Sequence, residues 1–219
     1  MNLATLRDQA AKFCADINQT RYAQDDYLIA INRAQEQFAL ETRSLWKDTT
    51  FTSAAADATY ELPSDFMFEE SVYFDGKPLD PMTRRDFAIL SPDTDWTLTT
   101  GTPTKYLIDP EEATKQILLY PIPNTNDASK VIALRYFPLP TALSADTDTP
   151  LNASLLMAQF HLGLAAYSAW LLLAGEVSSP EIQAKRRDLL AIYQDATEKA
   201  VETFKNTVSA GWRMRGTRH

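Results

Sequence analysis

A run of mostly apolar residues, LLMAQFHLGLAAYSAWLLLA, extends from Leu155 to Ala174 and limits the folds that this chain can adopt. A helix of this length could cross a lipid bilayer. However, Gln159, His161 and Ser168 interrupt the run, and no basic cluster flanks it. A helix that is apolar on nearly every side has to be covered by several neighbours. We therefore predict a central buried helix over about residues 151–174, and no membrane association.

Helical patterns on both sides of the chain's middle region supply those neighbours. Apolar residues recur at helical spacing from Leu3 to Ile17 and from Tyr27 to Leu45. Residues 178–181, Ser-Ser-Pro-Glu, are typical of a helix start, and the helix that follows is expected to end at about Val208. These patterns predict a bundle of two N-terminal and two C-terminal helices.

The pattern changes to short β-type runs between Thr49 and about Pro140. Seven runs are interpreted as strands: TTFT, TYEL, SVYF, KPL, TKYLID, QILLYP and KVIALRYF. Asp75-Gly76 lies between two of them and favours a tight hairpin, in which both turn residues need positive φ. A short helix is expected from Thr83 to Leu90. This middle region is predicted to be a small β domain inserted between helices.

The order of these elements predicts an α+β fold. Its main body is a helical bundle built from N- and C-terminal helices, with an inserted small β domain and an extended C-terminal tail. The expected parts are residues 1–48 (N-terminal helices), 49–148 (β-rich insertion), 149–208 (C-terminal helices) and 209–219 (flexible basic tail).

Charge is distributed unevenly along the chain. The last fifteen residues contain no acidic side chain, and their basic residues are Lys205, Arg213, Arg215 and Arg218. Without these four charges, the formal net charge of −8 becomes −12 for residues 1–204. Such an acidic body argues against a general nucleic-acid binder, although an acidic wall would let DNA pass without holding it.

Aromatic and arginine side chains are the usual anchors of protein interfaces. In the tail, Trp212 and Met214 accompany the arginines, so GWRMRGTRH is interpreted as a docking peptide. In the β region, we expect exposed loops to carry Trp96, Tyr106 and Phe68.

Patterns that indicate catalysis are missing from the sequence. The only histidines, His161 and His219, have no carboxylates at metal-ligand spacing, and His161 is expected to be a hydrogen-bonded interior residue. No phosphate loop, dinucleotide fingerprint or nucleophile elbow is found. The acidic pairs at 25–26, 69–70 and 111–112 fit a helix start, a strand edge and a turn better than a glycosidase cleft. We predict no catalytic residue, no cofactor and no metal.

The single cysteine and the start of the chain both indicate synthesis in the cytoplasm. Cys14 cannot form an internal disulfide and is expected to be a small core residue in a reducing compartment. Met1 leads directly into an amphipathic segment that does not have the pattern of a signal peptide.

Several short motifs, in this order, resemble those of the head-to-tail adaptor (connector) proteins of tailed bacteriophages. The motifs are DDYLIAINRAQEQFALETRSLW, ATYELPSDF, SVYFDGKPL, W-x-x-x-x-G-x-P-x-x-Y from Trp96 to Tyr106, LLYPIPN and RYFPLPTALSADTDTPL. The resemblance covers about residues 20–208.

The resemblance implies a virion neck protein that forms a ring of about twelve subunits between the portal and the tail. It implies contacts with the portal protein, with other copies of the chain, and with the tail or the next neck protein, while genomic DNA passes through without specific binding. It also implies a C-terminal segment that docks on the portal. The docking residues would be Trp212, Arg213, Met214, Arg215 and Arg218.

Three alternative functions stay open at this stage. Another ring of the same particle, such as a tail-completion or tail-tube protein, would have a similar composition. A small hydrolase with a cleft between the bundle and the β domain would need a convergent carboxylate pair. A cellular binding module could use the apolar helix from Leu155 to line a ligand pocket.

Overall fold

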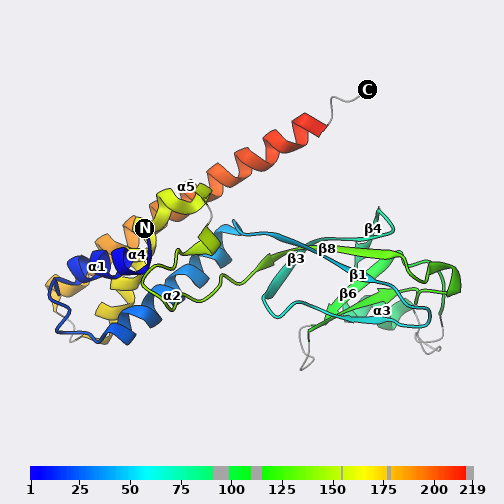
Figure 1. Ribbon diagram of the computed structural model, residues 1–219, viewed down its shortest axis with the longest axis horizontal. Coiled ribbons are helices and arrows are strands. Elements are labelled where there is room, and N and C mark those ends of the chain that lie inside the picture. The colour runs from blue at the N-terminus through cyan, green and yellow to red at the C-terminus, as the bar shows by residue number, and fades with distance from the viewer. Residues whose placement is uncertain (91–98, 110–114, 154, 177–178, 216–219) are drawn as a thin grey trace. The chain divides into compact units, whose positions relative to one another are not determined.

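The computed structural model describes residues 1–90, 99–109, 115–153, 155–176 and 179–215 (Figure 1). They form two compact units: Met1–Leu45 together with Leu139–His219, and Trp46–Pro138. The first unit is helical and the second is built mainly from strands, which confirms the α+β class. The strand-built unit therefore begins slightly before the predicted residue 49 and ends before the predicted residue 148.

The N-terminal part of the helical unit contains α1 (Leu3–Cys14) and α2 (Gln24–Thr42). The Asn2 side chain caps α1, since its Oδ1 accepts a hydrogen bond from the Thr5 backbone N–H at 3.0 Å. The prediction that the second helix continues to Leu45 is wrong. Arg43 adopts a left-handed conformation (φ 48°) and its N–H bonds to Ala39 O, which closes the last turn of α2.

The apolar run forms α4 (His161–Leu172), but the predicted continuous helix from residue 151 is wrong in its first part. Two 3₁₀ segments, Leu151–Ala153 and Leu155–Phe160, precede α4, and a third, Leu173–Gly175, follows it. The backbone of Asn152 is left-handed (φ 54°), which is incompatible with an α-helix through this point.

The last helix, α5 (Pro180–Arg215), starts as predicted and ends later than predicted. Ser179 Oγ accepts a hydrogen bond from the Ile182 N–H at 3.2 Å, so it caps the helix while Pro180 occupies the first turn. Beyond the expected end at Val208, the backbone stays helical to Arg215. The sequence there has no proline, and Gly211 alone costs only about 1 kcal/mol in a helix.

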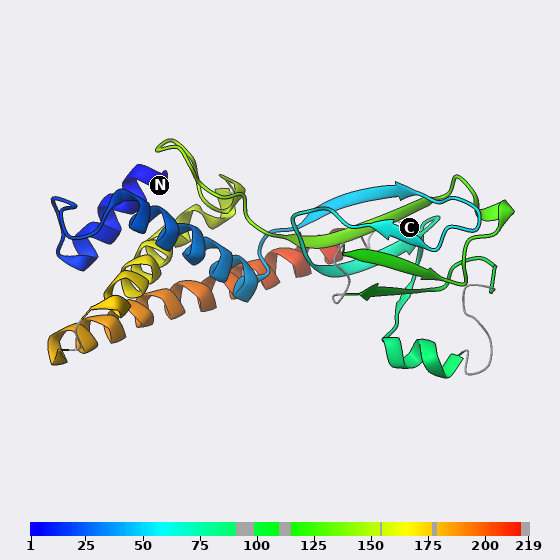
Figure 2. The ribbon, with the colours of Figure 1, turned by 90° about the horizontal axis from the view of Figure 1, so that it is seen from below.

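Helix α4 lies at the centre of the helical unit, in contact with α1, α2 and α5 (Figures 1 and 2). The window Met157–Gly175 is long and apolar enough to cross a membrane, and 56% of it is buried inside the described structure. The two helices α4 and α5 approach closely at Gly163, where an added Cβ would lie 2.6 Å from Ala196 Cβ. The core residues shared by the four helices include Leu6, Ile31, Phe38, Met157, Leu164, Tyr193 and Ala200.

Two side-chain amides of α2 hold the segment that returns from the strand-built unit. Gln35, fully buried, donates from Nε2 to Thr141 O at 3.0 Å and accepts the Leu151 N–H at Oε1 at 3.2 Å. Asn32 donates to Leu143 O at 3.0 Å and accepts the Leu143 N–H at 2.8 Å. Because buried backbone groups need partners, these amides determine the path of this irregular segment.

The strand-built unit contains two four-stranded sheets, ordered β1-β8-β3-β4 and β2-β7-β6-β5. The strands are β1 (Lys47–Thr52), β2 (Thr59–Glu61), β3 (Phe66–Phe74), β4 (Lys77–Pro78), β5 (Asp80–Pro81), β6 (Lys105–Asp109), β7 (Gln116–Tyr120) and β8 (Val131–Pro138). Each of the seven predicted runs contains a strand, whereas β5 was not predicted. The hairpin turn is confirmed, with φ of 48° at Asp75 and 78° at Gly76, and helix α3 (Arg84–Leu90) lies where a short helix was expected.

The two sheets pack on a common core that includes Phe66, Val72, Phe74, Tyr106, Ile117, Leu119, Ile132 and Leu134. The first and last strands of the unit are antiparallel neighbours, with Lys47 paired to Tyr136. The chain therefore enters and leaves the strand-built unit at adjacent positions.

Candidate interaction surfaces

The basic end of the chain lies on the last turns of α5. Trp212, Arg213, Met214 and Arg215 have helical backbone, whereas Arg218 lies outside the described residues. Four of the five predicted docking residues therefore have the backbone of a long helix, and the flexibility of this segment stays a prediction.

The predicted exposed contact residues of the β region have different environments. Trp96 lies outside the described residues. The prediction that Tyr106 is exposed on a loop is wrong, because it lies in β6 between β5 and β7 and is only 4% exposed. Phe68 is half-buried in β3 and is also not in a loop. The run TKYLID was itself predicted to be a strand. Because side chains alternate between the two faces of a strand, this run already indicated that Tyr106 could point into the core.

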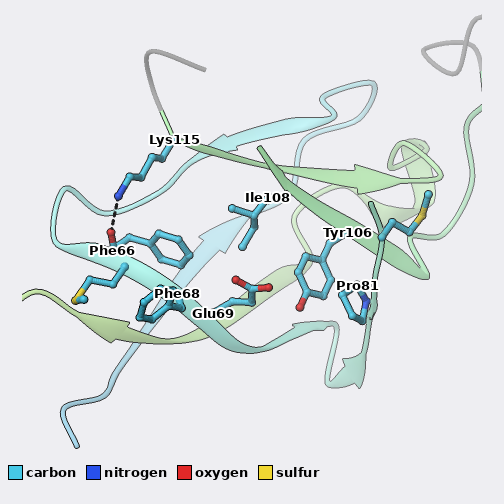
Figure 3. A pocket seen from close by; sticks show the side chains of 9 residues that line it. Phe66, Phe68, Glu69, Pro81, Tyr106, Ile108 and Lys115 are labelled. Atoms are coloured by element: carbon cyan, nitrogen blue, oxygen red, sulfur yellow. Dashed lines mark hydrogen bonds between the residues drawn. The ribbon is translucent and has the colours of Figure 1, made fainter. Parts of the chain in front are cut away.

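Phe68 and Tyr106 are nevertheless brought together, because both line one pocket of about 300 Å³ (Figure 3). The pocket lies between β3 of one sheet and the β5–β6 pair of the other. Its lining residues are Phe66, Met67, Phe68, Glu69, Pro81, Met82, Tyr106, Ile108 and Lys115. We call it the β3 pocket.

The β3 pocket has few polar groups. In Figure 3 the Glu69 carboxylate lies between the Phe66 and Phe68 rings on one side and Tyr106 on the other. Lys115 Nζ donates to Phe66 O at 2.9 Å and lies 5.9 Å from the centre of the Phe66 ring. Burial, and then the charge of Glu69, raise the pKa of Tyr106 to about 12, so its hydroxyl stays protonated at neutral pH.

One edge of β3 beside this pocket is only partly paired. Strand β3 pairs with β8 along its length, but on its other side it pairs with β4 only at Tyr73 and Phe74. The pairing ends near Val72, whose carbonyl accepts the Leu79 N–H at 2.9 Å, and at the start of β3 the Phe66 carbonyl accepts a hydrogen bond from Lys115 Nζ at 2.9 Å. Open strand edges present unpaired N–H and C=O groups that can bind an additional strand.

A second surface cluster lies around Arg135 on β8. Its guanidinium donates two hydrogen bonds to the Asp48 carboxylate, at 2.7 and 3.0 Å, and lies 4.9 Å from the centre of the Trp46 ring. The hydrogen bond from Arg135 lowers the pKa of Asp48. Trp46 is 50% exposed, and Tyr73 and Val131 are also exposed large apolar residues. An exposed aromatic side chain held by an arginine fits a protein contact better than catalysis.

The histidine and the cysteine inside the helical unit are both buried. His161 is 1% exposed, and its Nδ1 lies 2.8 Å from the Met1 amino nitrogen, which confirms the predicted hydrogen-bonded interior position. Burial, and then the nearby amino group, lower the pKa of His161 to about 4. Burial likewise raises the pKa of the Cys14 thiol to about 11, which makes it a poor nucleophile.

The acidic pairs form no catalytic constellation in the described part of the chain. Asp25 and Asp26 lie in the first turn of α2, as predicted. Glu69 faces the β3 pocket and Glu70 is exposed, while residues 111–112 lie outside the described residues. Within the described ranges, no group of three or more His, Cys, Asp or Glu side chains could hold a metal ion.

Comparison with known families supports one of the functions that the sequence suggested. The family described as SU10 adaptor protein matches residues 1–216. The chain belongs to the SU10 adaptor family. A comparison with curated proteins gives no match.

The SU10 adaptors are phage head-to-tail adaptors. The SU10-family chain described here is thus a phage structural protein of the virion neck, associated with head and tail components. Its family is one of structural adaptors. The surfaces described above are therefore best interpreted as contact surfaces.

Proposed function

We propose that this SU10-family adaptor forms a ring of about twelve subunits that joins the portal to the tail. The observation that carries the proposal is the family match over residues 1–216, which spans both compact units and most of the basic C-terminal segment. In a closed ring each subunit uses two different surfaces, one for each neighbour. A chain with two structurally distinct units offers such surfaces.

We propose that the C-terminal end of α5 docks on the portal. Trp212 would be the apolar anchor, and Arg213, Arg215 and Arg218 would bind carboxylates of an acidic portal groove. The guanidinium group matches a carboxylate with two parallel hydrogen bonds, which makes arginine well suited to such contacts. The helical backbone up to Arg215 supports docking as a projecting helix end rather than as a disordered peptide.

We propose that DNA passes through the ring without specific binding. Residues 1–204 carry a formal net charge of −12, and a channel wall of that sign would repel phosphate. The strand-built unit would contact the tail or the next neck protein.

Light scattering on a size-exclusion column tests the docking proposal. The full chain and a version that stops after Ala210 are each run alone and then mixed with the cognate portal. A Lys199→Ala variant is the matched control, because Lys199 is an exposed basic residue of the same helix, paired only with Asp195 among the described residues. We expect the full chain and the control to join the portal in a large complex, and the truncated chain to elute separately.

The outcomes separate the two parts of the proposal. If the truncated chain binds as well as the full chain, the adaptor ring stands and the role of the C-terminal segment is wrong. If no version binds and the protein stays monomeric with the portal present, the ring proposal itself is wrong.

A further inference from the structure

Helix α2 carries an exposed stripe on the side away from its buried residues. Four residues follow the spacing i, i+4, i+7 and i+11, so they lie within about 60° of one another around the helix. They are Ile29, Arg33, Glu36 and Leu40, and we call them the α2 stripe. Ile29 is 53% and Leu40 is 39% exposed. Among the described residues, neither the Arg33 nor the Glu36 side chain has an ion-pair or hydrogen-bond partner.

Helix α5 carries a second exposed stripe with the spacing i, i+4 and i+7. Its residues are Glu198, Glu202 and Lys205, which we call the α5 stripe. Together with Thr197 and Val201, they line a surface hollow of about 310 Å³. Glu198 and Glu202 are four residues apart, and like charges at this spacing destabilise a helix. No residue of the α5 stripe has an ion-pair partner in the described part of the chain, so a cation between the two carboxylates would stabilise this surface.

The two stripes cannot meet within one copy of the chain. In α2, buried residues such as Ile31 and Phe38 lie about half a turn around the helix from the α2 stripe. In α5, buried residues such as Tyr193 and Ala200 lie about half a turn from the α5 stripe. Both helices pack on α4 with their buried sides. Both stripes therefore face away from the core of the helical unit.

The order of charges in the two stripes is complementary when the two helices run parallel. In one such alignment, Arg33 is level with the midpoint between Glu198 and Glu202. Because helical residues rise by about 1.5 Å each, Glu36 then lies within about 3 Å of Lys205 along the axis. In the antiparallel alignment, Glu36 would lie beside Glu198 instead, and the two carboxylates would repel each other. The charges therefore select the parallel arrangement.

The apolar residues support the same alignment. Ile29 is then within about one residue of Thr197 along the axis, at the start of the hollow. Val201 forms a half-buried apolar wall of this hollow. Packing Ile29 against it would remove from water a large apolar side chain that is exposed in the single copy. The chain thus carries both the cation and the apolar group that fit the α5 stripe, which favours a second copy as the occupant.

A ring of about twelve copies provides the parallel arrangement. Within one helical unit, α2 and α5 run in the same general direction (Figures 1 and 2). Neighbours in a ring of about twelve are related by a rotation of about 30°, which changes the direction of any helix by no more than that angle. Helix α2 of one copy and α5 of the next therefore also run in the same general direction.

We propose that, in the ring, the α2 stripe of one copy packs on the α5 stripe of the next copy. Arg33 lies between the carboxylates of Glu198 and Glu202, and Glu36 lies beside Lys205. The contact joins two different faces of the chain, as a closed ring requires. This inference rests on the ring proposed above, and it is independent of how the C-terminal end of α5 docks on the portal.

Charge reversal in the full chain tests this contact. Light scattering on a size-exclusion column, with and without the cognate portal, gives the concentration at which half of the chains assemble. Glu198→Arg with Glu202→Arg should raise this concentration at least about tenfold, because three cations then meet at the contact. Arg33→Glu should act in the same direction. All three changes in one chain restore opposite charges and should return the concentration to within about threefold of the original.

Glu181→Arg with Asp188→Arg is the matched control for the α5 variant. Both residues are exposed acids of α5 outside the α5 stripe, so the change in net charge on the same helix is equal. This control should assemble like the unmodified chain, and circular dichroism on heating shows whether each variant is folded. Rescue by Arg33→Glu identifies the occupant, since a portal surface does not carry that change.

A cysteine pair tests the alignment. Glu36→Cys and Lys205→Cys in one chain should give a ladder of disulfide-linked oligomers on oxidation, because each copy then links to two neighbours. Either change alone should leave the chain largely monomeric on a denaturing gel. Cys14 does not interfere, because it is only 1% exposed. Strong dimers from Glu36→Cys alone would show that α2 meets α2, which contradicts the proposal.

The outcomes separate this contact from the ring itself. If the α5 charge variant assembles as well as its control, or if Arg33→Glu does not rescue it, the contact is wrong while the ring stands. If the α5 charge variant loses only portal binding, the α5 stripe binds the portal and not a second copy. If the unmodified chain does not assemble, alone or with the portal, the ring is wrong and this contact with it.

Discussion

Adding one methyl group at Gly163 tests whether the contact between α4 and α5 sets the spacing of the helical unit. The new Cβ would lie 2.6 Å from Ala196 Cβ, whereas carbon atoms in van der Waals contact are about 3.5–4.0 Å apart. Overpacking of a core costs about 1–3 kcal/mol. The upper part of this range applies because neither Cβ can rotate away. The better helix propensity of alanine offsets about 1 kcal/mol, so Gly163→Ala should lower the free energy of unfolding by about 1–2 kcal/mol.

Urea unfolding followed by circular dichroism at the helix band measures this difference. The decisive comparison is the double variant Gly163→Ala, Ala196→Gly, which moves the methyl group from α5 to α4 and removes the clash. It should unfold within about 0.5 kcal/mol of the unmodified chain, since one glycine and one alanine remain at the contact. If Gly163→Ala is as stable as the unmodified chain, or if Ala196→Gly fails to rescue it, the close approach does not determine the spacing.

Two further changes probe the polar interior of the helical unit. Gln35→Ala leaves Thr141 O and the Leu151 N–H without their side-chain partner and should cost about 2–5 kcal/mol in urea unfolding; a loss below 1 kcal/mol would show that the segment holds its path without the amide. The pKa of His161 is about 4 in the folded protein and about 6.5 in the unfolded chain. Because only the unfolded chain binds a proton between these values, the free energy of unfolding falls by up to about 3 kcal/mol as the pH drops from about 6.5 to 4. His161→Gln should flatten the pH dependence of unfolding in this window, and an unchanged profile would contradict the assignment.

Features that depend on neighbouring residues could be predicted from the sequence. The turn at Asp75-Gly76 follows from the need for positive φ at both positions, and it forms as expected. The start of α5 follows from a serine cap followed by proline. The strands of the β region follow from their composition and alternation.

Features that depend on distant contacts could not be predicted. Asn152 breaks the expected helix before α4, and this segment is fixed by bonds such as Leu151 N to Gln35, more than a hundred residues away. The end of α2 at Arg43 uses a left-handed arginine, which the sequence does not signal as a glycine would.

The sequence indicated which residue types could form contacts, but it did not indicate where those residues lie in the fold. Phe68 and Tyr106 were expected on exposed loops, yet they meet in a pocket because their strands belong to facing sheets. Glu69 was expected at a strand edge; it lies within β3, paired with Tyr136, and its place in an aromatic pocket depends on the packing of the two sheets. The composition of a single strand carries no information about its partner sheet.

The adjacent entry and exit of the strand-built unit have a consequence for how this protein can change. Because Lys47 and Tyr136 are paired neighbours, the two ends of the unit could be joined, or attached to another scaffold, by a short connection. Meanwhile, Asn32 and Gln35 hold the returning segment from the helical side, whatever lies between residues 45 and 139. The strand-built unit could therefore be exchanged as a whole without changing the helical sequence on either side. Recombination or engineering could replace the strand-built unit while the helices stay intact.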